Sequence, residues 1–234
     1  MHINRFPTDR LAYETAQKIS AILEREQDKD TLLLLAGGSA FAVYDSILPQ
    51  YLSDYVTIAM TDDRFSRDLN INNSHLLQAT DFYNECINND VYYISSEVWN
   101  EEKPEELATR FEYGLRKWRE EFPEGVVIAV FGVGEDGHTC GIIPEKNATL
   151  FGERFENPEK WVIGYTAPHN QYHERITITL PFIRKNVDYA VAFISGEKKR
   201  VALNKLLAEQ GNLTETPARI LRELKNVEIF TDIS

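Results

Sequence analysis

A run of apolar residues at positions 126–131, VVIAVF, restricts the possible folds of this chain more than any other feature. It carries no charge and no glycine, and most of its side chains are branched at Cβ. A run this short and this apolar predicts a strand that is buried on both faces of a sheet. Further strands are expected at 32–36, 56–60, 91–94, 161–167, 189–194 and 227–230.

Segments with helical spacing of apolar residues lie between these runs. The clearest are 9–27 and 103–121, and further helices are expected from Ala40 onward and after Lys199. Strands that alternate with helices predict a mostly parallel sheet in a three-layer α/β fold. The 234 residues suit a single domain over positions 1–234. The carboxyl ends of the strands are expected to gather the segments 37–39, 61–67, 132–139 and 195–199 at one edge.

The charge and the cysteines limit the classes of partner and compartment. A formal net charge of −12 argues against general nucleic-acid binding, which needs a basic surface. No apolar stretch approaches the roughly 20 residues that span a bilayer, and the start lacks the apolar core of a signal peptide. Two cysteines form no disulfide framework, so a cytoplasmic location is expected.

Glycines and acids follow the run at 126–131. Gly132, Gly134 and Gly137 allow tight turns and a close approach of a ligand to the backbone. The carboxyl edge of an open α/β sheet is where ligands bind, and His138 at that edge is suited to proton transfer near neutral pH. The alternative is a glycine turn that carries a solvated histidine.

A second glycine turn, Gly37-Gly38-Ser39, follows the expected strand at 32–36 and precedes a helix. This arrangement points free backbone N–H groups at an anion, and the Ser39 hydroxyl adds a donor. It is not a Walker loop, because the Gly-Lys-Ser/Thr ending is missing. A purely structural turn is the alternative. Lys198 and Lys199 stand at another strand–helix junction, either in an anion pocket or in solvent.

The polar segment 61–75 is expected to be a loop, in which Arg64 offers a planar fork to a phosphate or carboxylate. A solvated loop with internal Asp–Arg pairs is the alternative. His169 and His173 have the spacing of two metal ligands on a helix, but a proline precedes them and no acidic third ligand is evident. Exposed histidines are therefore favoured, and no metal site is predicted. Arg175, beside an apolar run, is better placed to contact a ligand.

Several blocks resemble the 6-phosphogluconolactonase family in order and spacing, over nearly the whole chain. GVGEDGHTCGIIP, residues 132–144, is similar to that family's GxGxDGHTASLFP signature. AGGS and TDDR, followed by Asn72-Asn73-Ser74, resemble its phosphate turn and its D-E-R…S-N segment, and RITITLP, SGEKKRVAL and TPARIL resemble its later blocks. The resemblance implies a Rossmann-like α/β/α fold shared with glucosamine-6-phosphate deaminases, and activity without a metal or an organic cofactor.

The resemblance also implies roles for particular residues. His138 would be the general base that activates water for attack on a lactone carbonyl. Asp136 would orient or polarise the site, or hold the imidazole. Backbone N–H groups of the 132–139 turn, including Gly134, would stabilise the oxyanion. The residues implied to bind the phosphate or the rest of the substrate are Gly37, Gly38, Ser39, Asp62, Arg64, Arg175 and Lys199.

The chain departs from the family's pattern at three places. The middle acid of D-E-R is Asp63, which is one methylene shorter, and Cys140 begins an altered stretch after His-Thr. The family's Lys-Pro-rich lead into R-I-T is replaced by residues 168–173. A phosphate-binding lysine is therefore expected to be missing, with His169 or His173 as its substitute.

The expected activity is hydrolysis of 6-phospho-D-glucono-1,5-lactone to 6-phosphogluconate in the oxidative pentose phosphate pathway. The expected partner is this phosphorylated sugar lactone, and a monomer or weak homodimer with no membrane or nucleic-acid partner is expected. An amino-sugar-phosphate deaminase or isomerase is disfavoured, because Ile143 stands where those relatives carry a catalytic glutamate. The glycines at 132, 134 and 137 could form a dinucleotide fingerprint, but no convincing apolar helix follows them. A sugar-phosphate sensor without turnover and Cys140 as a covalent nucleophile stay open.

Overall fold

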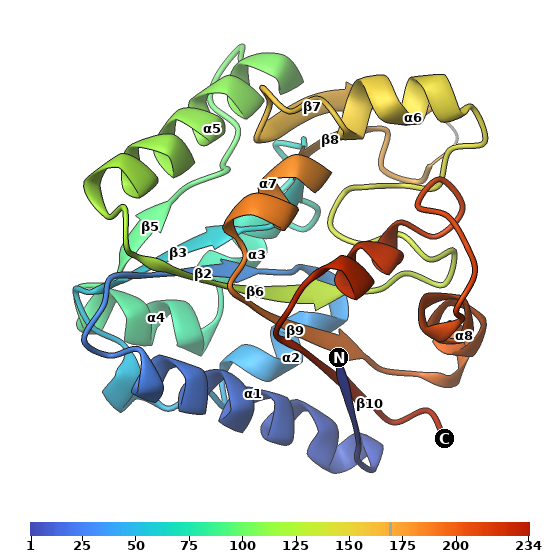
Figure 1. Ribbon diagram of the computed structural model, residues 1–234. Coiled ribbons are helices and arrows are strands. Elements are labelled where there is room, and N and C mark those ends of the chain that lie inside the picture. Colours follow the sequence, from blue (N-terminus) through green and yellow to red (C-terminus); the bar gives the residue numbers. More distant parts are fainter. Residues whose placement is uncertain (169) are drawn as a thin grey trace.

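The centre of the molecule is a sheet of seven strands, seen in the computed structural model of Figure 1, which describes residues 1–168 and 170–234. Their order is β1-β10-β9-β6-β2-β3-β5, and every adjacent pair is parallel. The strands are β1 (His2–Arg5), β2 (Thr31–Leu35), β3 (Val56–Met60), β5 (Tyr92–Ile94), β6 (Val126–Gly132), β9 (Tyr189–Ile194) and β10 (Val227–Thr231). The predicted mostly parallel sheet is confirmed.

The side chains of the inner strands alternate between two apolar cores, one on each face of the sheet. Leu33 and Leu35 of β2 belong to one core, and Leu32 and Leu34 belong to the other. Every residue of β2 and β3 is buried. Strands covered on both faces need continuous apolar runs, which explains why these runs could be located in the sequence.

Helices cover both faces, so the predicted three-layer α/β/α fold is confirmed. Figure 1 shows α1, α2 and α4 on one side of the sheet and α5 and α7 on the other. Leu11, Val43 and Phe82 attach the first group to its core, and Phe111 and Phe182 attach the second group to the opposite core. The helices are α1 (Thr8–Arg25), α2 (Phe41–Tyr44), α3 (Asn73–Gln78), α4 (Asp81–Asn88), α5 (Pro104–Glu121), α6 (Ala148–Phe155), α7 (Leu180–Asn186) and α8 (Arg200–Leu207).

A second, antiparallel sheet is the main feature that was not predicted. It has the order β4-β8-β7 and consists of β4 (Asp62–Arg64), β8 (Glu174–Ile178) and β7 (Val162–Thr166). The expectation that 61–75 is only a loop is therefore wrong. The polar β4 becomes a strand because it pairs with β8, with Asp62 opposite Thr177 and Arg64 opposite Arg175. The strand expected at 161–167 exists, but it belongs to this second sheet.

Some helical segments also differ from expectation. The stretch 145–160, for which no helix was predicted, contains α6. The rings of Phe151 and Phe155 in this helix pack against each other, and the Phe155 ring also packs against Tyr165. The helix expected from Ala40 onward is only the 3₁₀ segment η1 (Gly38–Ala40) and the short α2. A further 3₁₀ helix, η4 (Pro217–Glu223), follows Thr216. No helix among the described residues is long and apolar enough to cross a membrane.

The order of the strands creates a crevice at the carboxyl edge of the sheet. After β2 the chain continues to β3 on one side, whereas after β6 it continues toward β9 on the other side, and β2 and β6 are neighbours. The two connections therefore diverge from adjacent strands, which is the point where open α/β sheets bind ligands. The two glycine turns found in the sequence lie at these strand ends.

Candidate active site

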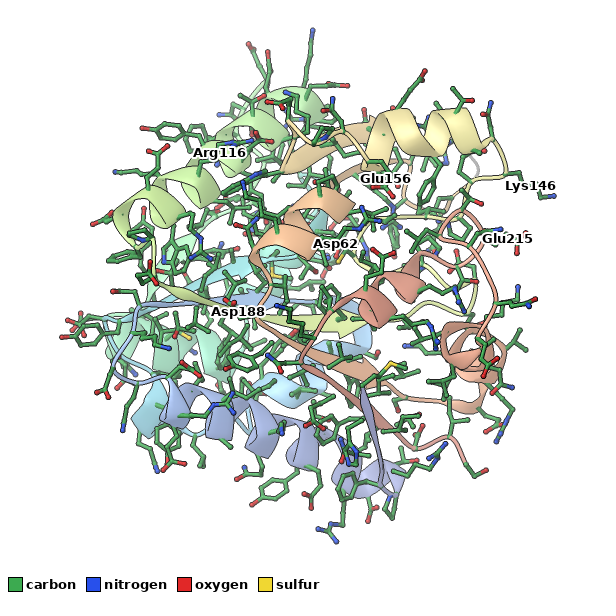
Figure 2. All side chains as sticks on the ribbon, in the orientation of Figure 1. Asp62, Arg116, Lys146, Glu156, Asp188 and Glu215 are labelled. Carbon is green, nitrogen blue, oxygen red and sulfur yellow. The ribbon has the colours of Figure 1, made fainter. Side chains whose placement is uncertain are left out.

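A cleft of about 470 Å³ lies at this edge, and it gathers residues from distant parts of the sequence. The residues that line it are Ala36, Gly37, Gly38, Ser39, Asp62, Arg64, Asn73, Gly132, Val133, Gly134, Glu135, His138, Cys140, Asn170, Gln171, Tyr172, Arg175 and Lys199. All the predicted site residues line it except Asp136, which contacts the cleft through His138. Asp62 is buried and is labelled near the middle of the view in Figure 2, whereas Lys146 and Glu215 lie at the periphery of that view.

His138 is held by the turn that follows β6. Its Nδ1 atom lies 2.6 Å from Oδ1 of Asp136, and its backbone N–H donates to the same oxygen at 3.1 Å. Because a carboxylate only accepts hydrogen bonds, the neutral ring carries its proton on Nδ1 and leaves Nε2 as a base. Burial raises the pKa of Asp136, but the hydrogen bonds from His138 outweigh this effect. The pKa is therefore lowered overall, and the carboxylate stays ionised beside the ring.

The glycines shape this turn. The N–H of Gly137 donates to the carbonyl of Gly134 at 3.0 Å, and Gly137 adopts a φ of +88°, which favours glycine. A Cβ atom on Gly134 would lie 2.1 Å from Nδ1 of His138 and 2.6 Å from Oδ1 of Asp136. Gly134 is therefore required by the contact between the imidazole and the carboxylate.

One part of the predicted role of Gly134 is wrong. Its N–H, expected to face an oxyanion, donates to the carbonyl of His138 at 2.9 Å. The N–H groups of Gly137 and His138 are also used within the turn. These three donors close the turn and are not free to bind a substrate oxygen.

The turn after β2 and Lys199 form the cationic side of the cleft. Gly38 has a φ of +66°, and the Ser39 hydroxyl accepts a hydrogen bond from Nζ of Lys199 at 3.3 Å. Burial lowers the pKa of Lys199, whereas the carboxylates of Glu135 and Asp232 raise it. Lys199 after β9 thus contacts the glycine turn, although the short η1 and α2 supply little helix dipole.

Arg175 lies buried on β8 next to an equally buried acid. Its Nη1 atom is 3.8 Å from Oδ2 of Asp62, and only 6% of the residue is exposed. Burial raises the pKa of Asp62, whereas the charges of Arg175 and His138 lower it. Asp62 and Arg175 therefore form a buried pair of opposite charges in the cleft that also contains His138.

Sequence reasoning missed the structural role of Asp63 and the presence of Asn73 in the cleft. The fully buried Asp63 carboxylate accepts hydrogen bonds from the backbone N–H groups of Arg64, Asn73 and Ser74 and from the Ser96 hydroxyl. These bonds attach the start of α3 to β4 and place the Asn73 side chain against Gly37. Two acids in sequence give no signal that one faces the cleft and the other faces the interior.

The expectation for the histidines at 169 and 173 is settled only for one of them. His173 is exposed and does not line the cleft, so it does not replace a phosphate-binding lysine. His169 lies outside the described residues. The segment instead contributes Asn170, Gln171 and Tyr172 to the cleft, and none of these was predicted.

Cys140 is expected to be unreactive as a nucleophile. The residue is 7% exposed, and burial together with the nearby Asp62 charge raises the pKa of its thiol well above the usual range. Burial also raises the pKa of Cys86 to about 12. Because the thiolate is the reactive form, we expect iodoacetamide at pH 8 to alkylate both cysteines at least about tenfold more slowly in the folded protein than in urea. Rapid labelling of Cys140 in the folded protein would restore it as a candidate nucleophile.

The fold and the cleft define the class of protein. They describe an α/β/α protein in which a histidine–carboxylate pair faces a glycine turn and several cations. A family model matches residues 7–230, and the chain belongs to the family of glucosamine-6-phosphate isomerases and 6-phosphogluconolactonases.

Relatives of known name match parts of the chain. The 6-phosphogluconolactonase of Helicobacter pylori is 36% identical over 104 residues, which cover 44% of this chain and 43% of that protein. The 6-phosphogluconolactonase of Chlamydia trachomatis is 33% identical over 102 residues, which cover 43% of this chain and 36% of that protein. The match thus spans less than half the length of these curated relatives.

Solved structures match the whole fold. A 6-phosphogluconolactonase from Shewanella baltica has a TM-score of 0.79 at 20% identity, and the match covers 99% of this chain and 96% of that protein's chain. A monomeric glucosamine-6-phosphate deaminase has a TM-score of 0.72 at 16% identity, and the match covers 99% of this chain and 97% of that protein's chain. At such identities the likeness shows the fold alone, so the activity must be argued from the cleft.

Proposed function

We propose that the protein hydrolyses 6-phospho-D-glucono-1,5-lactone to 6-phosphogluconate, as a step of the oxidative pentose phosphate pathway. The observation that carries this proposal is the His138–Asp136 pair, which shares one cleft with Ser39, Arg64 and Lys199. A base at one place and anion-binding groups at another suit a substrate with a reactive carbonyl and a phosphate. The named relatives support the same activity. Two free, buried cysteines are in keeping with a cytoplasmic location.

In the proposed mechanism, Nε2 of His138 removes a proton from water, and the resulting hydroxide attacks the lactone carbonyl carbon. Asp136 accepts the hydrogen bond from the Nδ1–H group of His138 throughout the reaction, and its charge stabilises the imidazolium. We assign stabilisation of the oxyanion to Arg175, a cation that lines the same cleft as His138. The intermediate collapses with cleavage of the bond between that carbon and the ring oxygen, and the imidazolium returns its proton to this oxygen.

The deaminase alternative is weakened by the position of Ile143. This residue stands where those relatives carry a catalytic glutamate, and it packs against the apolar core without lining the cleft. No acid from this position reaches the substrate. A dinucleotide site is also disfavoured, because α6 begins only at Ala148 and the glycines after β6 open no helix.

The phosphate is expected to decide which lactone is hydrolysed. Lys199→Met removes a charged donor from the cleft, so we expect the KM for 6-phosphogluconolactone to rise by about tenfold to a hundredfold, the usual range for a charged hydrogen bond. The rate with unphosphorylated glucono-1,5-lactone should stay unchanged. Both rates are measured by titrating released acid, after subtraction of spontaneous hydrolysis.

Lys198→Met is the matched control, because Lys198 is the adjacent lysine and is exposed outside the cleft. It should behave like the unmodified protein. Absence of turnover above the spontaneous rate would reject the lactonase proposal. Turnover that is equal for the two lactones would reject the phosphate site while keeping the hydrolase.

A further inference from the structure

Residues 170–172 contact both arginines of the cleft. Arg175 donates a hydrogen bond from Nη2 to Oδ1 of Asn170 at 2.8 Å, and another from Nε to the carbonyl of Tyr172 at 3.2 Å. The Tyr172 ring lies under the second arginine, with Cζ of Arg64 4.0 Å from the ring centroid. A short polar segment thus connects two cations that come from the paired strands β4 and β8.

Arg175 is the fixed end of this connection. It belongs to β8, is buried, and lies beside the buried Asp62 carboxylate. A buried guanidinium needs acceptors, and residues 170–172 supply two of them. These bonds therefore determine where the backbone of Tyr172 lies and, through it, where the aromatic ring is placed.

The position of the Arg64 side chain depends on this segment. Its side chain makes one long hydrogen bond within the described residues, from Nη1 to the carbonyl of Ile71 at 3.4 Å. The Tyr172 ring lies against the guanidinium without accepting a hydrogen bond from it, and both side chains line the cleft. Stacking of this kind restrains a flexible side chain without consuming its donors. A pre-oriented arginine loses less conformational freedom when it binds an anion.

We propose that Tyr172 is a positioning residue that holds Arg64 as an anion-binding group, and that residues 170–172 thereby compensate for the phosphate-binding lysine that is expected to be missing. The identity of the anion, a sugar phosphate, rests on the proposed function. The positioning itself does not rest on it, because it follows from contacts within the protein. The segment adds no charge of its own but organises the charge that β4 and β8 supply.

The test is calorimetric titration with 6-phosphogluconate and, separately, with inorganic phosphate. We expect Tyr172→Leu to weaken 6-phosphogluconate binding by about threefold to tenfold, the range expected for a partly exposed cation–π contact. Tyr172→Phe keeps the ring and should rescue the affinity to within about twofold. Tyr113→Leu is the matched control, because Tyr113 is 69% exposed on α5 and does not line the cleft. Thermal midpoints of all variants verify that each is folded.

A double-mutant cycle distinguishes positioning from a general loss of structure. In an Arg64→Ala background, Tyr172→Leu should change the affinity by less than about twofold, because the residue it positions is gone. Equal losses in both backgrounds, or no loss in the first, would overturn the proposal. Failure of the unmodified protein to bind either anion would also overturn it. Failure of the lactonase proposal gives a different result, namely intact binding and an intact cycle without turnover.

Discussion

Replacement of His138 by asparagine is expected to lower turnover of 6-phosphogluconolactone by about a hundredfold or more, the usual contribution of a general base. Asparagine preserves much of the shape of the side chain but cannot take a proton from water. Affinity for the product should change little, because the anion-binding groups lie elsewhere in the cleft. The measurement is kcat for the lactone together with calorimetric affinity for 6-phosphogluconate.

His173→Asn is the control for this experiment, since that histidine is exposed and lies outside the cleft. It should retain full turnover. If His138→Asn also retained full turnover, the protein would still be a hydrolase but His138 would not be its base. Binding of 6-phosphogluconate by a protein that shows no turnover before mutation would instead indicate a sugar-phosphate sensor.

Gly134→Ala is expected to reduce turnover nearly as much as the loss of His138 itself. The added methyl group would occupy the place of Nδ1 of His138 and crowd Oδ1 of Asp136. The imidazole is the movable partner, so the protein should fold with the ring displaced from its carboxylate. The expected result is a thermal midpoint close to that of the unmodified protein and a kcat reduced by about a hundredfold.

Gly152→Ala provides a matched control for this prediction. Gly152 lies in α6, and a Cβ atom there would meet nothing within 4 Å. Alanine also favours a helix over glycine, so stability should be equal or slightly higher. Full activity of Gly134→Ala would show that the contact between His138 and Asp136 is dispensable.

Much of the fold could be predicted because the buried strands need apolar runs. β3 and β9 have the expected bounds, since strands covered on both faces leave no room for charge. Once these strands were located, the two glycine turns could be placed at one edge of the sheet, because parallel strands end on the same side. The cleft position of His138 and Lys199 followed from this topology together with the family resemblance.

The parts that could not be predicted depend on contacts between distant segments. β4 is polar and is a strand only because β8 lies beside it. The role of Tyr172 depends on Arg64, which is far away in the sequence and has no periodic relation to it. The hydrogen bond from the Gly134 N–H to the His138 carbonyl likewise depends on the backbone path of the turn. Local patterns carry no signal for such contacts.

The pairing of β1 with β10 has a consequence for the order of assembly during synthesis. Asn4 of β1 donates a hydrogen bond to Glu228, 224 positions later in the chain. At about 5–20 residues per second, translation separates the two strands by roughly 10–45 s. A long apolar strand left unpaired for that time would be an aggregation hazard. β1, with the sequence HINR, is short and polar, and it is at most half-buried even in the finished sheet. Because of its composition, β1 can stay unpaired and solvated without aggregating until β10 has left the ribosome.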